Sequence, residues 1–314
     1  MQTVEKCPLC ASEHIEKITK HVFKYPGVNV HDHLLDATYV RLWILFERIL
    51  KNRTDVVFYS SLCNKCGLIF TNPRFSDEDL KTKYDAIIEL GSVKYRLQQN
   101  PPTNLDTRAK RIYTLVNKHF RSNSGRRPRV LDYGGASGYN LIPFLDTFRC
   151  CILDYEKWDL PEGIEYLGPD TSDLYDGEQF DVILLLHTLE HVTEPKAFLA
   201  ELCTFLKDEG IIYVEVPLGC FREWRSLSEP LTHVNFFSEE SLYNCFRFCD
   251  LSAIHISTAY QWLIHGKTWC INMLGTKHSH SELTFQAPLL TRKQMNRALY
   301  FLPYLYAFVQ KWVR

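Results

Sequence analysis

The sequence lacks the marks of several large classes of protein. Its 36 Lys and Arg residues nearly balance its 37 Asp and Glu residues, whereas proteins that bind nucleic acid or anionic membranes non-specifically carry a basic excess. It has no apolar run near the roughly 20 residues that cross a bilayer, and residues 1–6 contain no apolar segment of a secretory signal. We therefore expect a cytoplasmic protein without a transmembrane segment, and we do not expect nucleic acid as its partner.

Internal repeats and low-complexity tracts are also absent, and the composition is that of a globular protein. The 314 residues are 46% hydrophobic and 23% charged, which is enough for one large core and an accessory module. The chain has 11 cysteines. In a chain of this size without a secretory signal, cysteines predict metal ligands and buried thiols rather than disulfides.

Two C-x-x-C pairs near the N-terminus predict a structural zinc site. The four cysteines are Cys7, Cys10, Cys63 and Cys66. Two such pairs supply the four thiolates of a tetrahedral Zn²⁺ site, and Gly67 suits a turn whose amides point at sulfur, while Ala11 fits less well after the first pair. The insert, residues 11–62, is longer than the roughly 15–20 residues of a compact zinc ribbon. Four unrelated buried cysteines are the alternative.

Apolar residues at helical spacing predict three helices before the first buried strand, over residues 34–50, 77–90 and 105–120. Ser76 and Asp79 form the N-terminal cap of the second, and Gly91 is expected to end it. Within this region Tyr84 and Tyr95 are candidates to reach a substrate, although aromatic residues at helical spacing more often belong to the core. His31-Asp32-His33 is more typical of a solvated loop than of a second metal site.

Residues 130–141, with the sequence VLDYGGASGYNL, predict a buried strand, a glycine turn and a helix. The glycines that allow positive φ and a close approach of a ligand to the backbone are Gly134, Gly135 and Gly138. A dinucleotide fingerprint requires glycine where this chain has Ala136 and Tyr139, which disfavours a pyrophosphate. The carboxylate of Asp132 instead attracts a cation, such as the ammonium and sulfonium groups of S-adenosylmethionine.

This stretch resembles motif I, D-x-G-x-G-x-G, of the class I S-adenosylmethionine-dependent methyltransferases, with Ala136 at the middle glycine. Residues 180–192, FDVILLLHTLEHV, resemble the strand 4 segment of the same superfamily, about 50 residues later, as two βα units require. The resemblance implies an α/β, Rossmann-like fold with a mostly parallel seven-stranded sheet and a closing antiparallel strand. We predict this methyltransferase domain over residues 101–280, after a zinc-binding and helical module in residues 1–100 and before a helical tail in residues 281–314.

Within this domain, apolar runs and turn residues predict the remaining elements. The expected strands cover residues 150–153, 164–167, 182–186, 211–216, 251–258 and 268–274. A helix is expected from Glu194 to Leu206, with Gly210 closing it. The tail, residues 289–313, is rich in Leu, Tyr and Phe, and we expect it to cover the core, with a homodimer contact or a membrane surface as alternatives.

The resemblance places the cofactor at the carboxyl ends of the strands, where doubly wound sheets bind ligands. An acid after the second strand accepts both ribose hydroxyls, and we choose Asp154 over Glu156. For the adenine amine we choose Asp173 over Asp170. His187 follows the fourth strand at the same edge. The predicted cofactor-binding residues are Asp132, Gly134, Gly135, Ala136, Gly138, Asp154, Asp173 and His187.

Residues 215–217 and 231–238 resemble the methyltransferase type 23 group, to which the sugar C-methyltransferases of deoxysugar pathways are similar. Those enzymes also have an N-terminal zinc knuckle and a His-x-x-[FY]-[FY]-Ser segment. The resemblance associates the histidine at the place of His233 with base catalysis, accompanied there by Tyr and Glu just upstream. Here Pro230 and Thr232 occupy the neighbouring positions.

Methyl transfer from a sulfonium needs few side chains, because it is a single in-line displacement. The acceptor must still lose a proton, for which a histidine with a pKa near neutrality is suited. We predict His233 as the base and His187 as the second candidate, with His191 packing beside Glu190. The expected acceptor is a small molecule, namely a sugar, sugar nucleotide or surface-glycan precursor, methylated at oxygen or carbon. The alternatives are an RNA or protein methyltransferase that docks through the zinc module, and an inactive scaffold that binds the cofactor.

Overall fold

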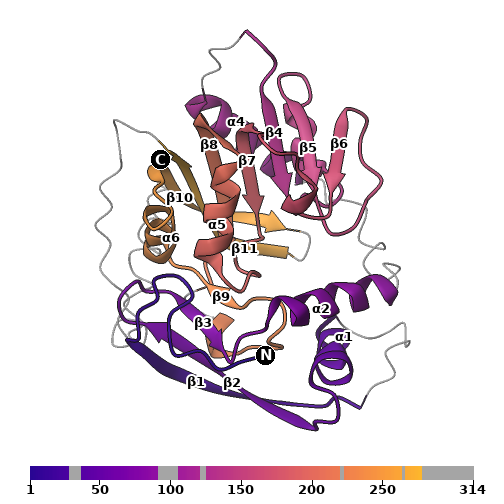
Figure 1. Ribbon diagram of the computed structural model, residues 1–314, viewed down its shortest axis with the longest axis vertical. Coiled ribbons are helices and arrows are strands. Elements are labelled where there is room, and N and C mark those ends of the chain that lie inside the picture. Colours follow the sequence, from indigo (N-terminus) through magenta and orange to yellow (C-terminus); the bar gives the residue numbers. More distant parts are fainter. Residues whose placement is uncertain (28–36, 91–104, 121–124, 220–222, 264–265, 278–314) are drawn as a thin grey trace.

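The computed structural model describes residues 1–27, 37–90, 105–120, 125–219, 223–263 and 266–277, which form two sheets with flanking helices (Figure 1). The predictions for His31, His33, Gly91, Tyr95 and the tail in residues 281–314 fall outside these residues. No helix in the described part of the chain is both long enough and apolar enough to cross a bilayer.

The larger sheet confirms the predicted fold class. Its strands are β4 (Arg129–Tyr133), β5 (Arg149–Leu153), β6 (Ile164–Gly168), β7 (Phe180–Leu186), β8 (Leu206–Pro217), β10 (Ser252–Leu263) and β11 (Gly266–Thr276). They lie in the order β10-β11-β8-β7-β4-β5-β6. From β8 to β6 all neighbours are parallel, while β11 is antiparallel to both β8 and β10. One closing strand therefore runs against the others.

Helices cover both faces of this sheet. Helix α4 (Leu105–His119) and the 3-10 helix η2 (Tyr139–Phe144) pack on one face, against Val130, Ile152 and Val182. Helices α5 (Pro195–Thr204) and α6 (Glu239–Arg247) pack on the other, against the alternate strand residues Leu131, Leu153 and Ile183. Because neighbouring residues of a strand point to opposite faces, the continuous apolar runs of β4 and β7 are buried on both sides.

The helix predicted after the glycine turn is present as a short 3-10 helix. Gly138 has φ +72° and precedes η2, which is a six-residue 3-10 helix and not an α-helix. Pro143 lies inside η2, has no N–H to donate and clashes with the preceding turn of an α-helix. The prediction that Gly210 closes the next helix is wrong, because α5 ends at Thr204 and Gly210 lies inside β8. A Cβ on Gly210 would lie 3.0 Å from the carbonyl oxygen of Asp181, so glycine lets these two strands approach closely.

The smaller sheet was not predicted. It consists of β1 (Ile15–Lys24), β2 (Asp55–Cys63), β3 (Ile69–Asn72) and β9 (Asn235–Phe236), in that order and antiparallel throughout. The predicted helix over residues 34–50 is described from residue 37 on, as α1 (Ala37–Trp43) followed directly by a π-helix, η1 (Ile44–Leu50). Helix α2 (Asp77–Glu89) begins at the predicted Ser76 and Asp79 capping box.

The smaller sheet and its helices form an accessory unit, which is joined to the rest of the chain through strand β9 and the side chain of Arg74. Strand β9 comes from the segment after β8, and Asn235 pairs with Phe70 of β3. Arg74, which follows β3 and is 2% exposed, donates hydrogen bonds to the carbonyl oxygens of Val192 and Val234. Figure 1 shows the accessory unit below the larger sheet, with β9 and α2 between the two. The two units therefore share backbone and side-chain contacts.

Candidate active site

Four polar side chains lie where parallel strands of the larger sheet end. Asp132 is the next-to-last residue of β4, Asp154 follows β5, His187 follows β7, and Glu215 is near the end of β8. Parallel strands end at the same edge of a sheet, so these residues gather at the edge where doubly wound folds bind ligands. The sequence predicted three of the four and missed Glu215.

Asp132 is completely buried, and neither of its carboxylate oxygens has a hydrogen-bond donor among the residues that the structure describes. Burial raises the pKa of this carboxyl to about 7, because the nearby Arg108 offsets the loss of water only in part. A Cβ on Gly135 would lie 2.9 Å from the Oδ2 atom of Asp132. Glycine is thus required where the turn passes over the carboxylate.

Asp154 faces the glycine turn. Its Oδ2 atom accepts a hydrogen bond from the N–H of Ala136 at 2.9 Å, and its Oδ1 atom accepts one from the N–H of Glu156 at 3.2 Å. Asp154 is 4% exposed, and its burial raises its pKa. Ala136 has φ +45°, a left-handed conformation that costs a residue with a Cβ roughly 1–2 kcal/mol. The position of the middle glycine of motif I is therefore strained in this chain.

Asp173 lies near the same edge of the sheet, but its side chain contacts residues close to it in the sequence. It is exposed, ends the 3-10 helix η3 (Thr171–Asp173), and its Oδ2 atom accepts a hydrogen bond from the N–H of Asp170 at 3.4 Å. A Cβ on Gly168, at the end of β6, would lie 2.5 Å from the Cβ of Asp173. The side chain thus packs against the strand that neighbours β5.

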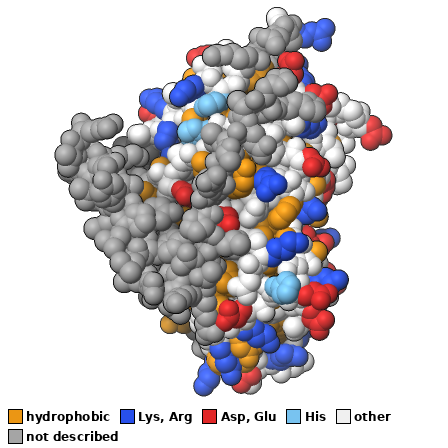
Figure 2. Space-filling model, turned by 90° about the vertical axis from the view of Figure 1, so that its left-hand side faces the viewer, with side chains coloured by type: hydrophobic (Ala, Val, Ile, Leu, Met, Phe, Trp, Pro, Cys, Tyr) orange, Lys and Arg blue, Asp and Glu red, His pale blue; other side chains and the backbone are white. Residues whose placement is uncertain are grey.

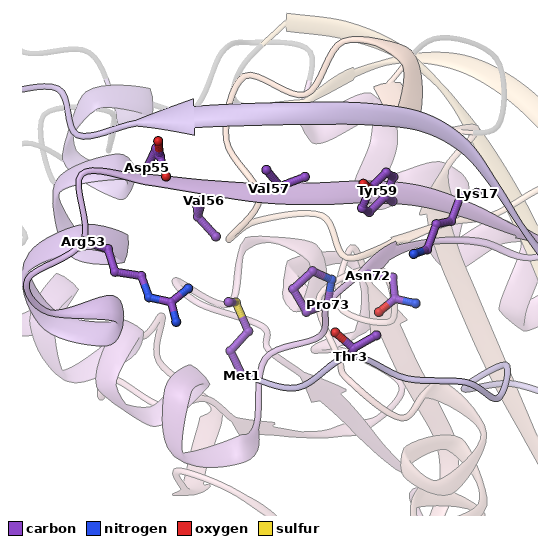
Figure 3. Close-up of a pocket in the computed structure, with 10 residues that line it drawn as sticks. All are labelled: Met1, Thr3, Lys17, Arg53, Asp55, Val56, Val57, Tyr59, Asn72 and Pro73. Carbon is purple, nitrogen blue, oxygen red and sulfur yellow. The ribbon is translucent and has the colours of Figure 1, made fainter.

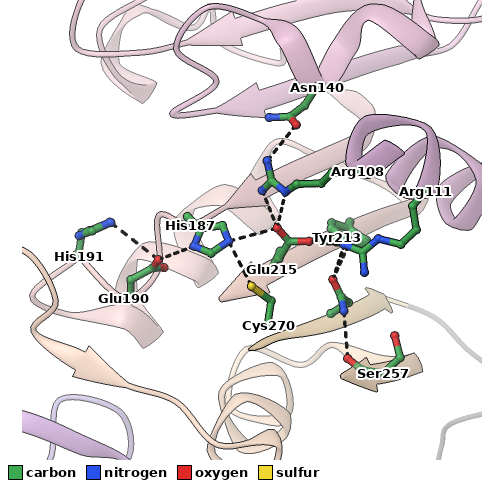
Figure 4. A network of polar contacts seen from close by, with 11 residues as sticks. Arg108, Arg111, Asn140, His187, Glu190, His191, Tyr213, Glu215, Ser257 and Cys270 are labelled. Carbon is green, nitrogen blue, oxygen red and sulfur yellow. Dashed lines mark hydrogen bonds and ion pairs between the residues drawn. The ribbon is translucent and has the colours of Figure 1, made fainter. Parts of the chain in front are cut away.

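His187 is held between two buried carboxylates (Figure 4). Its Nδ1 atom is 3.2 Å from Oε1 of Glu190, and its Nε2 atom is 3.2 Å from Oε1 of Glu215. Burial lowers the pKa of His187, but contacts with Cys270 and the two carboxylates outweigh burial and raise it well above the ordinary value. The backbone of His187 has φ +56°. Strained backbone of this kind concentrates at functional sites.

Glu215 is the centre of the network in Figure 4. Its side chain is fully buried and accepts hydrogen bonds from Nε of Arg108 at 2.8 Å and from Arg111 at 2.8 Å, both on α4. Burial raises the pKa of Glu215, but Arg108 and His187 lower it well below the ordinary value. Arg108 also donates to Oδ1 of Asn140 at 3.0 Å. This network ties α4 to the segment after the glycine turn.

A second cluster contains Glu190, His191 and His233. One ligand atom of each lies within 4.8 Å of the other two. The Nδ1 atom of His191 is 2.6 Å from the carbonyl oxygen of Thr232, and the Nδ1 atom of His233 is 3.0 Å from Oε2 of Glu223, in the 3-10 helix η4 (Glu223–Arg225). The sequence predicted His233 as functional and His191 as a packing residue, and the structure brings the two rings to 5.0 Å.

The charges of this cluster are set by burial and pairing. Burial opposes ionisation of Glu190, but the neighbouring histidines lower its pKa to about 2. Burial also lowers the pKa of His191, to about 3, which keeps its ring neutral. For His233 the effect of burial is outweighed by Glu223 and Glu190, which raise the pKa. The cluster therefore contains one carboxylate and one neutral imidazole beside His233.

The four predicted cysteine ligands gather in the accessory unit. The Sγ atoms of Cys7 and Cys66 are 3.6 Å apart, those of Cys10 and Cys63 are 3.5 Å apart, and all four lie within 4.8 Å of one another. Zinc bonded tetrahedrally to sulfur at about 2.3 Å spaces the sulfurs by roughly 3.8 Å. Ala11 and Gly67 have φ +55° and +77°, so both knuckles make the same turn. The four residues fit a Zn²⁺ ion.

A family model described as "Methyltransferase domain" matches residues 72–256, which is more than half of the chain. The chain belongs to this family. It is a class I S-adenosylmethionine-dependent methyltransferase, with the sheet order and the acidic strand ends described above. A search of curated proteins finds no match.

Several solved structures are similar to this methyltransferase at low identity. The 1,6-didemethyltoxoflavin-N1-methyltransferase of Burkholderia thailandensis, solved with bound 1,6-didemethyltoxoflavin and S-adenosylhomocysteine, is 15% identical, with a TM-score of 0.49 over 68% of this chain and 95% of that one. The structure of the Haloferax volcanii Trm112 methyltransferase activator in complex with a putative methyltransferase shows 18% identity and a TM-score of 0.41, over 57% of this chain and 98% of that one. An S-adenosylmethionine-dependent methyltransferase of Methanosarcina mazei shows 14% identity and a TM-score of 0.41, over 52% of this chain and 97% of that one. The family assignment rests on the family model.

A cavity of about 430 Å³ in the methyltransferase's accessory unit is separate from the strand ends (Figure 3). Arg53 and Lys17 lie at its two ends, with Met1 and Pro73 between them. None of its lining residues is among those predicted for the cofactor, the acceptor or the metal. The polar side chains described above lie at the strand ends and not in this cavity.

The accessory unit contributes residues beside the strand ends. The rings of Tyr84, on α2, and Tyr155, after β5, have centroids 4.5 Å apart. The Nζ atom of Lys83 donates to the carbonyl oxygen of Leu231 at 3.3 Å. Tyr84 was predicted as a residue that can reach a substrate, and it lies beside the residue that follows Asp154. Helix α2 is thus a boundary of the candidate site.

Proposed function

We propose that this methyltransferase acts in the cytoplasm on a small-molecule acceptor, namely a sugar, sugar nucleotide or surface-glycan precursor. The observation that carries the proposal is the position of α2, whose Tyr84 packs on Tyr155 beside the strand ends. An accessory unit that borders the site on this side favours a small acceptor over a polymer. The net charge of −1, and the interspersed acidic and basic side chains on the face in Figure 2, also favour an acceptor other than RNA.

We propose that S-adenosylmethionine is held by Asp132, Gly134, Gly135, Ala136, Gly138, Asp154, Asp173 and His187. The buried oxygens of Asp132, which have no donor among the described residues, fit a ligand that brings cationic groups. When bound, S-adenosylmethionine supplies a methyl group on a sulfonium sulfur. The carbon–sulfur bond breaks with its electron pair left on sulfur, as the acceptor forms its bond to the methyl carbon.

We propose that the acceptor loses its proton beside His233. Both nitrogens of His187 contact carboxylates at 3.2 Å, so this histidine has no free nitrogen with which to take a proton. Among the described residues, the hydrogen-bond partner of His233 is Glu223, at Nδ1, and the side chain is 30% exposed, which leaves Nε2 to face the acceptor. His187 is better suited to fixing Glu190 and Glu215 at the cofactor edge.

We propose that Cys7, Cys10, Cys63 and Cys66 bind one structural Zn²⁺ ion. A closed shell of four thiolates has no position for a substrate, so the ion contributes to folding and not to chemistry.

We also propose that the chain divides into a zinc-binding and helical module in residues 1–100, a methyltransferase domain in residues 101–280 and a tail in residues 281–314. The tail is proposed to form a homodimer contact. Sedimentation of the full chain and of a chain ending at residue 277 tests the dimer.

Incubation with S-adenosylmethionine labelled in the methyl group, and with nucleotide sugars, glycan precursors, tRNA and proteins, tests the proposed acceptor class. We expect label in a small-molecule carbohydrate. Label in RNA or protein would overturn the proposal in favour of an enzyme that docks through its accessory unit. Binding of S-adenosylmethionine without transfer to any acceptor would favour a scaffold.

A further inference from the structure

The cluster of Glu190, His191 and His233 has the composition of a metal site. It combines two imidazoles and one carboxylate whose ligand atoms lie within 4.8 Å of one another. Glu190 is 1% exposed, whereas the side chains of His191 and His233 are 22% and 30% exposed. The carboxylate is thus the buried part of the cluster, and the two imidazoles are the part that solvent can reach.

The hydrogen bonds of both histidines fix the tautomer that a metal ligand needs. The carbonyl oxygen of Thr232 can only accept, so the Nδ1 atom of His191 carries the proton and the Nε2 atom has the free lone pair. That Nε2 atom is 3.8 Å from Oε1 of Glu190. Glu223 holds His233 in the same way through Nδ1. Carbonyl and carboxylate partners of this kind orient histidine ligands in metal sites.

The carboxylate of Glu190 is incompletely satisfied. The Nδ1 atom of His187 approaches Oε1 to 3.2 Å as an ion pair, but neither oxygen has a hydrogen bond with good geometry among the described residues. Buried carboxylates are normally paired and hydrogen-bonded, or they coordinate a metal. A cation placed between the carboxylate and the two imidazoles satisfies all three groups.

We infer that Glu190, His191 and His233 bind one divalent first-row metal ion. Two imidazoles and one carboxylate suit such ions and leave coordination positions open for a ligand. The inference rests on the proposed function, because it assigns these positions to a hydroxyl oxygen of the acceptor. The ion lowers the pKa of that hydroxyl, whose proton passes to solvent, and the oxygen then bonds to the methyl carbon. His233 thereby acts on the acceptor as a ligand of the ion and not as a free base.

Titration of the full-length protein holding one zinc per chain with Mn²⁺, followed by electron paramagnetic resonance, tests the inference directly. Mn²⁺ accepts carboxylate oxygen as a ligand and is poorly matched to the thiolates of the cysteine cluster, where the zinc stays bound. We expect one Mn²⁺ per chain, with affinity at least tenfold lower in His191→Ala and in Glu190→Gln. Glu223→Gln preserves the shape of the carboxylate and should weaken binding by about 10- to 100-fold. His255→Ala, which removes a histidine of β10, should bind Mn²⁺ like the parent.

Calorimetric affinity for S-adenosylmethionine verifies that each variant is folded, and Glu190→Gln keeps the test decisive where an alanine variant fails to fold. Absence of both Mn²⁺ and Co²⁺ binding, or binding that survives Glu190→Gln and His191→Ala, would overturn the inference. Full methyl transfer by protein stripped with a chelator that leaves the cysteine-bound zinc in place would also overturn it, while the proposed function stands. Metal binding without any methyl transfer would support the inference and refute the proposed function.

Discussion

The Nδ1 atom of His233 lies 3.0 Å from the Oε2 atom of Glu223, ten residues earlier in the chain. This contact gives His233 the acidic partner that its sequence neighbours, Pro230 and Thr232, do not provide. Gly219 makes room for it, because a Cβ at that position would lie 3.1 Å from the same Oε2 atom. The partner is therefore supplied by the folding of the segment after β8 and not by a local motif.

Asp132 should control the affinity for S-adenosylmethionine. Asp132→Asn preserves the shape of the side chain but removes the charge that pairs with a cationic ligand. Loss of a charge-assisted contact worth about 1.5–3 kcal/mol lowers affinity by roughly ten- to hundredfold. Calorimetry should find this loss in Asp132→Asn and not in Asp176→Asn, which changes an exposed carboxylate. Equal affinity in the parent and in Asp132→Asn would refute the assigned role.

The pKa of Asp132 predicts how the affinity for S-adenosylmethionine depends on pH. The pKa of Asp132 is about 7 in the folded protein, so the carboxyl is neutral below that pH and cannot attract a cation. Affinity should fall by up to about tenfold for each pH unit below 7 and level off above it. The raised pKa also destabilises the unliganded fold as the pH rises from about 4 to 7, where the unfolded state has already released the proton. A dissociation constant that is the same at pH 6 and pH 8 would contradict this assignment.

The cysteine cluster should hold zinc that the fold requires. Cys63→Ser should lower the zinc content by one ion per chain and reduce the free energy of unfolding by at least about 4 kcal/mol, as expected for loss of a structural metal. Elemental analysis and urea unfolding measure the two effects. Cys249→Ser, away from the cluster, should retain the zinc. A Cys63→Ser protein as stable as its parent would show that the thiols pack without a metal.

Arg74 should hold the accessory unit on the methyltransferase domain. Its guanidinium donates to the carbonyl oxygens of Val192, Thr193 and Val234, and burial lowers its pKa to about 10. Arg74→Leu removes the donor to the carbonyl oxygen of Thr193 and to Oδ1 of Asn235, at roughly 1–3 kcal/mol for each group left unpaired, whereas the carbonyl oxygens of Val192 and Val234 keep other donors. Urea unfolding should show a loss of at least about 2 kcal/mol. The exposed Arg53→Leu is the control and should change stability by less than about 0.5 kcal/mol.

Much of the larger sheet is predictable from the sequence because its signals are local. The apolar run of β7 and the glycine turn after β4 each specify an element without reference to the rest of the chain. The smaller sheet is different. Strand β9 has only two residues and exists because Asn235 and Phe236 pair with β3. A strand defined by a distant partner has no periodicity of its own to detect.

The candidate site divides in the same way. Asp132 and Asp154 could be predicted because strand ends are visible in the sequence, and the two C-x-x-C pairs because their spacing is a signal in itself. Glu215 was missed because nothing near it in the sequence explains a buried acid inside a strand. Its partner, Arg108, lies on a helix far earlier in the chain and contacts Glu215 only in the folded protein. The proximity of Glu190 and His233 could not be predicted either, because it depends on the folded loop that brings His233 beside Glu190.

Methyl transfer from labelled S-adenosylmethionine to a panel of nucleotide sugars, by the parent and by His233→Ala, tests the account most directly. We predict label in a small-molecule carbohydrate, a kcat about 10²- to 10⁴-fold lower in His233→Ala, and a nearly unchanged dissociation constant for S-adenosylmethionine. This result is expected whether His233 contacts the acceptor itself or through a metal ion. Label that enters only RNA or protein, or a His233→Ala enzyme that keeps its kcat, would contradict the account.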